Sequence, residues 1–253
     1  MNTELDRILE GSLSRRTMLK TAAVGFAGVT LGQLGCRTSA GTAAQAEEIR
    51  ELAAGSERVQ DILNVTATVE GFGVTFLGAG IESAEQNRFN KPWPANVLAV
   101  VKAARAQEKF HLDFFESAGG RAFVDAFTIP PAALADFNTF FGAVVEQEGL
   151  EIAAQLAAIR TYAGLKRPDL MKVSFQYAAE EAEHRILANY TLGARPANDI
   201  AFAPMSLSST SAIIDSMKKR GLINGGGTRV AFPGPGTIDA TNVINTRPDG
   251  PSA

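Results

Sequence analysis

The sequence predicts an all-α protein in which four long helices pack together as a bundle. Apolar residues recur about every 3.6 residues in four separate stretches between residues 59 and 190, which is the period of a helix with one buried face. Proline and glycine residues interrupt this pattern between the stretches, so turns are expected to join the helices. Of the 253 residues, 45% are apolar, which is enough for a sizeable core.

The charge balance argues against one class of partner. The formal net charge is −3, and charged residues make up 20% of the chain. No run of five or more basic residues occurs anywhere in the sequence. Proteins that bind nucleic acid carry a basic patch or stripe, so we expect no nucleic-acid partner.

The first 40 residues predict a targeting segment that does not belong to the fold. The stretch from Ser14 to Lys20 resembles the twin-arginine export signal, with Met18 where that signal usually has phenylalanine. The apolar stretch that follows, Thr21 to Gly35, is too short and too rich in glycine for a stable transmembrane helix. We therefore expect export by the twin-arginine pathway to the periplasm or cell envelope, with no transmembrane helix in the mature protein.

The only cysteine, Cys36, lies at the end of this apolar stretch. Its position invites a lipoprotein interpretation, in which Cys36 becomes a lipidated N-terminus that anchors the protein. Gln33 stands where that motif prefers an aliphatic residue, so cleavage among the alanines between Thr38 and Ala44 is the alternative. With one cysteine, no disulfide forms within the chain.

The first long helix is expected to begin near Val59, after an Ala/Glu-rich linker or short helix over residues 41–57. Gly71 and Gly73 each cost about 1 kcal/mol relative to alanine inside a helix, and they predict the close approach of a neighbouring element. We expect the Gly78-Ala79-Gly80 run to weaken the helix. A polar loop from Ser83 to Ala95 follows.

The second and third helices are expected over Ala95 to Ser117 and Ala132 to Tyr162. Gly119-Gly120 ends the second helix, and Pro130-Pro131 prevents a continuous helix through residues 121–131. The connection from residue 119 to 131 reaches at most about 45 Å when extended, whereas a helix of 24 residues is about 36 Å long. The connection can therefore cross the whole length of the bundle, which gives an up-down-down-up arrangement.

The fourth helix is expected over Asp169 to Tyr190, after a turn at Gly164 to Pro168. The bundle as a whole then covers residues 58–192. Residues 193–253 form a C-terminal extension with a short helix at about 210–220 and otherwise irregular structure, because glycine and proline are frequent there.

Both histidines of the chain lie three residues after a glutamate, in the pairs Glu108/His111 and Glu181/His184. Residues three apart on a helix lie on the same face, so each pair offers a carboxylate and an imidazole to a common point. Two such pairs on two helices are what a metal site in a bundle core requires.

The first helix supplies a further carboxylate at the same height as the second. In an antiparallel hairpin, residues at equal height have numbers whose midpoint falls at the centre of the connecting loop. The midpoint of Glu70 and Glu108 is residue 89, the centre of the expected loop from Ser83 to Ala95. Glu70 is therefore a candidate ligand.

The third helix offers two carboxylates that pass the same test. The midpoint of Glu148 and Glu181 falls between residues 164 and 165, inside the turn expected at Gly164 to Pro168. Glu151 with Glu181 gives residue 166, which also lies in the turn. Glu148 is preferred because it continues the apolar stripe of Phe141 and Val144, and Glu151 stays open.

Four carboxylates and two imidazoles are a ligand set that suits two iron or manganese ions. Zinc would favour four-coordinate sites with fewer oxygen ligands. Burial of six ionisable groups in an apolar bundle would be very unfavourable without a metal to neutralise them. Tyr177, one turn before Glu181, is expected to be a core aromatic residue, with a hydrogen bond to the site as the alternative. The predicted ligands are Glu70, Glu108, His111, Glu148, Glu181 and His184.

With this ligand pattern the chain resembles the ferritin-like superfamily of di-iron and di-manganese carboxylate proteins. More narrowly, it is similar to exported bacterial ferritin-like-domain proteins, which include desiccation-related proteins. The resemblance covers about residues 58–192 and the short helix near residue 213. It implies a ferritin-like four-helix bundle with a dinuclear centre. The long loop between the first two helices, the export signal and the C-terminal extension depart from a ferritin subunit, so neither cage formation nor iron storage is expected.

We expect redox chemistry on a small oxidant, O₂ or peroxide, and the sequence leaves ferroxidase, peroxidase and catalase-like activity open. The alternative is a non-catalytic stress or desiccation protein that keeps the bundle for binding or stability. A purely structural bundle without metal is a third interpretation. The oligomeric state, a homo-oligomer included, stays open.

Overall fold

The computed structural model describes residues 57–244, and these residues are mostly helical, as the sequence predicts. The predictions for the export signal, for Cys36 and for most of the linker over residues 41–57 lie outside the described residues. The elements are α4 (Val59–Glu85), α5 (Ala95–Ser117), β1 (Ala126–Ile129), a 3₁₀ turn (Pro131–Leu134), α6 (Phe137–Gly164), α7 (Pro168–Thr191), α8 (Ala212–Lys219) and β2 (Thr228–Ala231).

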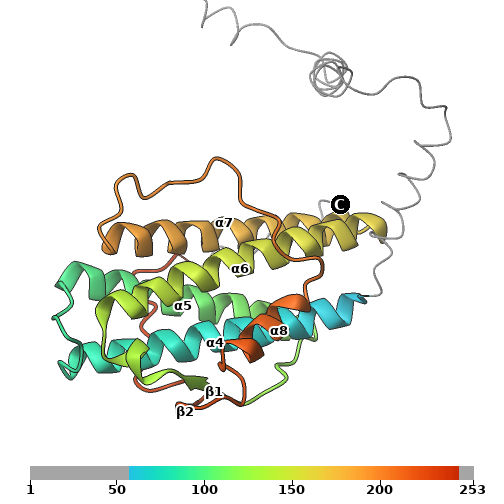
Figure 1. The fold of residues 1–253 in the computed structure, drawn as a ribbon. Helices are drawn as coiled ribbons and strands as arrows, with labels where there is room; N and C mark the ends of the chain where they lie inside the picture. Colours follow the sequence, from blue (N-terminus) through green and yellow to red (C-terminus); the bar gives the residue numbers. More distant parts are fainter. Residues whose placement is uncertain (1–56, 245–253) are drawn as a thin grey trace, which may run out of the picture. The chain divides into compact units, whose positions relative to one another are not determined.

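The four long helices lie lengthwise beside one another (Figure 1). α4 and α5 form one antiparallel pair, and α6 and α7 form a second. The segment between α5 and α6 carries the chain back along the helices, so these two helices run in the same direction (Figure 1). The short helix α8 packs against α4 and α6.

Helix α4 is the most deeply buried of the four long helices. Every residue from Val65 to Ile81 is buried. Among the described helices, only α4 is long and apolar enough to cross a membrane by length and composition, but 89% of its apolar window is buried inside the fold. That burial is typical of a core helix, because a soluble fold places its most apolar helix at its centre.

The Gly78-Ala79-Gly80 run does not end the first helix, and the loop expected from Ser83 begins later, since α4 continues to Glu85. A Cβ atom on Gly78 would stand 2.6 Å from Cζ of Arg105, and one on Gly80 would overlap the ring of Phe140. Both glycines therefore allow neighbouring side chains to reach the helix backbone. The packing gained there offsets the low helix propensity of glycine.

The second helix has the expected bounds, but the third begins later than expected. Residues Pro131–Leu134 form a 3₁₀ turn, and α6 starts at Phe137. Asp136 caps this start, because its Oδ1 atom accepts a hydrogen bond of 2.7 Å from the backbone N–H of Thr139. An aspartate cap satisfies an N–H that has no partner within the helix.

The C-terminal extension contains a strand that the sequence analysis did not predict. β2 pairs antiparallel with β1, with Ala126 opposite Ala231 and Ile129 opposite Thr228. Arg105 on α5 binds the segment that follows β2. Its guanidinium donates hydrogen bonds of 2.8 Å to the carbonyl of Pro233 and 3.4 Å to that of Gly236. The extension is therefore tied to the helices by buried hydrogen bonds.

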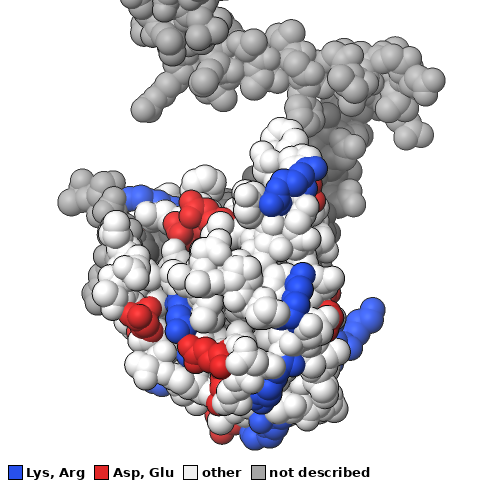
Figure 2. Space-filling view, turned by 90° about the vertical axis from the view of Figure 1, so that its left-hand side faces the viewer, with Lys and Arg blue, Asp and Glu red and all other residues white. Residues whose placement is uncertain are grey.

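Acidic and basic side chains both lie on the end face of the helices (Figure 2). Uncharged residues cover most of this face, and acidic and basic side chains lie among them, in places directly beside each other (Figure 2). This face therefore carries charges of both signs.

Candidate metal centre

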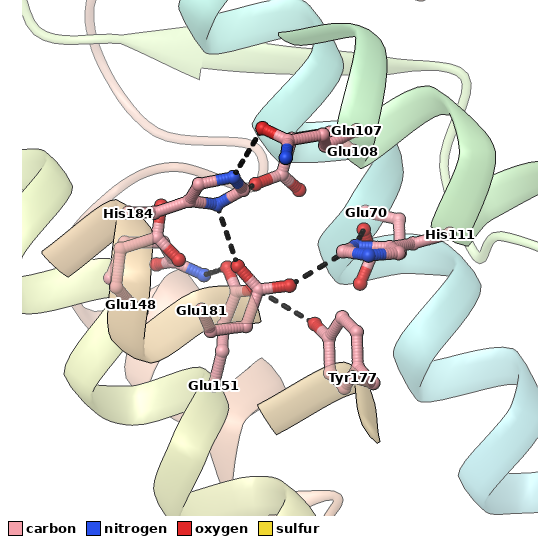
Figure 3. A network of polar contacts seen from close by, with 10 residues as sticks. Glu70, Gln107, Glu108, His111, Glu148, Glu151, Tyr177, Glu181 and His184 are labelled. Carbon is pink, nitrogen blue, oxygen red and sulfur yellow. Dashed lines mark hydrogen bonds and ion pairs between the residues drawn. The ribbon is translucent and has the colours of Figure 1, made fainter. Parts of the chain in front are cut away.

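The four long helices bring all six predicted ligands into one region (Figure 3). Five of the six side chains are buried, and only that of His111, 17% exposed, has more than slight access to solvent. The contributions by helix are Glu70 from α4, Glu108 and His111 from α5, Glu148 from α6, and Glu181 and His184 from α7.

The six side chains form two overlapping groups, each able to hold a metal ion. In each group the ligand atoms lie within 4.8 Å of one another. Glu108 and Glu181 belong to both groups. Glu70 and His111 complete the first group, and Glu148 and His184 complete the second. Each group therefore has one glutamate and one histidine of its own and shares two carboxylates with the other.

His184 directs its Nδ1 atom toward the carboxylates (Figure 3). This atom lies 2.9 Å from Oε2 of Glu181 and 3.1 Å from Oε1 of Glu108. The other ring nitrogen, Nε2, lies 3.2 Å from Oε1 of Gln107, which can only accept a hydrogen bond. This contact places a hydrogen on Nε2, so Nδ1 is the atom available to a metal.

His111 presents the same ring atom from the other side of the site. Its Nδ1 lies 3.2 Å from Oε1 of Glu181 and 3.5 Å from Oε2 of Glu70. Burial opposes a charge on both histidines, but the neighbouring carboxylates outweigh it. They raise the pKa of His111 above its ordinary value and the pKa of His184 to about 10.

Several carboxylate oxygens of the site are buried and lack a hydrogen-bond partner among the described residues. They include Oε1 of Glu70 and one oxygen each of Glu108 and Glu148, whereas Oε2 of Glu70 and Oε1 of Glu181 lie 3.5 Å and 3.2 Å from Nδ1 of His111. Burial first, and repulsion by neighbouring carboxylates second, raise the pKa of Glu70 and Glu148 well above the ordinary value. Unpartnered buried acceptors are costly, and a cation at their centre would satisfy them.

Glu181 behaves differently from the other carboxylates. Burial alone would raise its pKa, but the nearby His184 and His111 lower it below the ordinary value. Glu181 therefore stays ionised between the two imidazoles. Its place between the histidines matches its membership of both groups.

The structure distinguishes the two candidate carboxylates of α6. Glu148 belongs to the second group, with its Oε1 3.7 Å from Nδ1 of His184. Glu151 is also buried, but its oxygens accept hydrogen bonds of 2.7 Å from the Tyr177 hydroxyl and 2.9 Å from Nε2 of Gln147. Glu148 thus belongs to a group that could hold a metal ion, whereas Glu151 lies beside it with hydrogen-bond partners of its own.

Tyr177 is a core aromatic residue, as preferred from the sequence, and it also makes the hydrogen bond that was the alternative. Its ring is buried against His111, with ring centroids 5.0 Å apart, while its hydroxyl binds Glu151. Sequence reasoning missed Gln107, whose side chain fixes His184. No periodicity marks a residue whose role depends on a neighbouring helix, although the i,i+3 spacing of Glu148 and Glu151 could have suggested that both face the site.

Gly73 supports the close approach of α4 and α5 at the site. A Cβ atom on this residue would stand 2.8 Å from Cδ of Glu108. The expected close approach is therefore found at Gly73. It is not found at Gly71, where a Cβ atom would make an ordinary contact of 3.7 Å with Phe127.

Neither a scan against protein-family models nor searches of curated proteins and of solved structures found a match for this chain.

Proposed function

We propose that this chain is an exported ferritin-like metalloprotein that holds two iron or manganese ions and uses them for redox chemistry on O₂ or peroxide. The observation that carries this proposal is the sharing of Glu108 and Glu181 between the two ligand groups. A shared pair of carboxylates is the arrangement expected for two ions side by side. The direction of the four long helices supports an up-down-down-up bundle (Figure 1).

The donor set favours iron or manganese. Each proposed position has one imidazole and otherwise carboxylate oxygens. Manganese prefers oxygen ligands and iron accepts imidazole as well, whereas zinc is usually four-coordinate with nitrogen or sulfur ligands. When bound, such a pair of ions supplies the electrons or the activation that O₂ or peroxide requires.

The residues of the chain have separate roles in this proposal. Glu108 and Glu181, which belong to both groups, would contribute to both positions and balance the positive charge of the two ions. Gln107 holds His184 in one tautomer through its contact with Nε2. His111 forms the more exposed edge, so a small oxidant would approach the centre from this side.

Metal analysis of protein purified from its native compartment is the first test. We expect about two iron or manganese ions per chain, and fewer than about 0.2 would contradict the proposal. Replacement of both His111 and His184 by alanine should remove the metal while the helical circular dichroism remains. Glu181→Ala should also lower the metal content, and Glu183→Ala is its matched control, because Glu183 is exposed on the same helix. Retention of metal in the double variant would show that the ligand assignment is wrong.

Turnover assays on the loaded protein separate an enzyme from a binding protein. Peroxide consumption and Fe(II) oxidation should both be measured against the metal-free double variant. Activity that depends on His111 and His184 supports an oxidoreductase and shows which of the ferroxidase, peroxidase and catalase-like reactions occurs. A loaded protein without turnover would instead support the non-catalytic stress or desiccation protein.

A further inference from the structure

A pocket of about 690 Å³ lies between α5 and α7, on the outer side of the metal centre. His111 and Tyr177 line the pocket, so the pocket borders directly on the proposed metal site. Pockets of about 300–1,000 Å³ are typical of sites for small organic molecules. The oxidants O₂ and peroxide are far smaller than this space, so the pocket indicates a second and larger reactant.

Aromatic and aliphatic side chains form most of the lining. Phe115 and Tyr177 are buried at its base, with ring centroids 5.5 Å apart, while Phe175 is 69% exposed at its edge. Rings packed in this way favour a flat aromatic occupant, because aromatic pairs gain energy beyond their buried area. Other apolar side chains in the lining include Phe110, Phe114, Val173 and Ile244.

The polar lining groups favour a neutral occupant with hydroxyl groups. Asp113 and Glu180 place carboxylates at the pocket, and Lys109 pairs with Asp113. An anionic ligand would be repelled by these carboxylates. The amides of Gln107 and Gln176 offer acceptors, and Oε1 of Gln176 is buried without a hydrogen-bond partner within residues 57–244. A ligand hydroxyl would supply that partner after a rotation of the amide.

The pocket connects to the centre through a single imidazole. The ring of His111 lines the pocket, and its Nδ1 atom faces Glu181 and Glu70. His184 has no such contact, because its side chain is 3% exposed and lies outside the pocket lining. An occupant that touches His111 is therefore one ring away from the proposed metal position.

We propose that this pocket binds a neutral phenolic molecule that serves as the electron donor of the metal centre. The donor role rests on the proposed function, with peroxide as the oxidant. For a hydroquinone, two O–H bonds break, and the molecule gives up two electrons and two protons to become a quinone. The O–O bond of H₂O₂ breaks and takes up those electrons and protons, so that two water molecules form.

Binding is tested on the metal-free full-length protein with hydroquinone as the probe, by isothermal titration and ligand-observed NMR. Ala179 is an exposed alanine of α7 that lines the pocket, so Ala179→Trp should fill it without disturbing the core. Ala163→Trp is the matched control, since Ala163 is exposed on α6 outside the lining. We expect Ala179→Trp to weaken binding by about tenfold or more and Ala163→Trp to leave it unchanged.

The donor role is tested on the loaded protein by peroxide-dependent quinone formation. Ala179→Trp should lose about nine-tenths of this rate or more while its metal content stays at the wild-type level. The proposal is overturned if the wild-type protein does not bind hydroquinone, if Ala179→Trp binds it equally well, or if bound hydroquinone is not oxidised. A metal-containing protein that does not bind hydroquinone refutes the pocket assignment alone. Hydroquinone binding to a protein that never acquires metal refutes the proposed function and the donor role.

Discussion

The carboxylate of Glu108 on α5 lies directly against the backbone of Gly73 on α4. A Cβ atom on Gly73 would stand 2.8 Å from Cδ of Glu108. Because Glu108 belongs to both ligand groups, the absence of a side chain at residue 73 determines where a shared carboxylate can lie. Helix packing and the proposed metal chemistry therefore depend on the same glycine.

We expect Gly73→Ala to weaken metal binding by about tenfold, because the new methyl group displaces the Glu108 carboxylate within a buried site. Metal titration with a competing chelator measures the change. Gly142→Ala on α6 is the control, since a Cβ atom there meets no other atom within 4 Å. The control should keep full affinity and gain about 0.4–1 kcal/mol in the free energy of unfolding. Equal affinities in both variants would contradict the role of Gly73.

Gln107 is expected to act as a positioning residue for His184. Gln107→Leu removes the acceptor 3.2 Å from Nε2, so the ring loses its fixed orientation. Metal affinity should fall by about tenfold to a hundredfold, whereas Gln107→Glu keeps an acceptor and should retain most of the affinity. Chelator competition and the ligand-field spectrum of a cobalt-substituted protein report the change. A leucine variant with an unaltered spectrum would exclude this role.

The metal-free protein should become less stable as the pH rises from about 5 to about 8. Burial raises the pKa of three glutamates above the ordinary 4.5, and neighbouring carboxylates raise the pKa of His184 from 6.5 to about 10. The folded protein then holds more protons than the unfolded chain in this range, so the free energy of unfolding falls with increasing pH. Glu181, whose pKa is lowered, is ionised in both the folded and the unfolded state in this pH range and does not change the pH dependence. The three glutamates with a raised pKa are Glu70, Glu148 and Glu151.

Metal should reverse this pH dependence. A bound cation requires deprotonated ligands, so metal binding strengthens as the pH rises. Urea unfolding at several pH values, with and without metal, measures both slopes. The same slope with and without metal would show that the six groups are not the ligands.

Arg105 is expected to anchor the C-terminal extension. Its guanidinium is buried and donates hydrogen bonds to the carbonyls of Val74, Pro233 and Gly236. Arg105→Met leaves these acceptors unsatisfied and should cost about 2–5 kcal/mol in the free energy of unfolding. Lys102→Met is the control on the same helix, because the exposed pair of Lys102 with Glu85 contributes at most about 1 kcal/mol. Limited proteolysis should then cut the extension of the Arg105 variant first.

The sequence was sufficient for features that depend on local periodicity. Ala95 to Ser117 was predicted with its observed bounds, because an apolar stripe lies between Pro94 and Gly119-Gly120. The Glu-x-x-His spacing identified two helical pairs that the structure brings together. These features are encoded within one helix, where side-chain spacing follows directly from the backbone.

Features that depend on distant parts of the chain could not be predicted in this way. The pairing of β1 with β2 joins residues about a hundred positions apart, and neither four-residue strand has an alternating pattern. The space that Gly78 leaves open is filled by Arg105 of the next helix. Likewise, Glu148 and Glu151 both satisfy the midpoint test, and the hydrogen bond that distinguishes Glu151 comes from Tyr177, 26 residues away on another helix.

The two halves of the proposed centre repeat the same residue types, but they differ in burial, so one metal position is closer to solvent than the other. The His111 side chain is 17% exposed, whereas that of His184 is 3% exposed. Ions should therefore enter and leave at the His111 position first, and a chelator should strip the protein in a fast step and then a slow one. A protein stripped only in the fast step would keep its buried ion and accept a different metal at the His111 position, so a mixed pair could be prepared by partial removal followed by addition of the second metal.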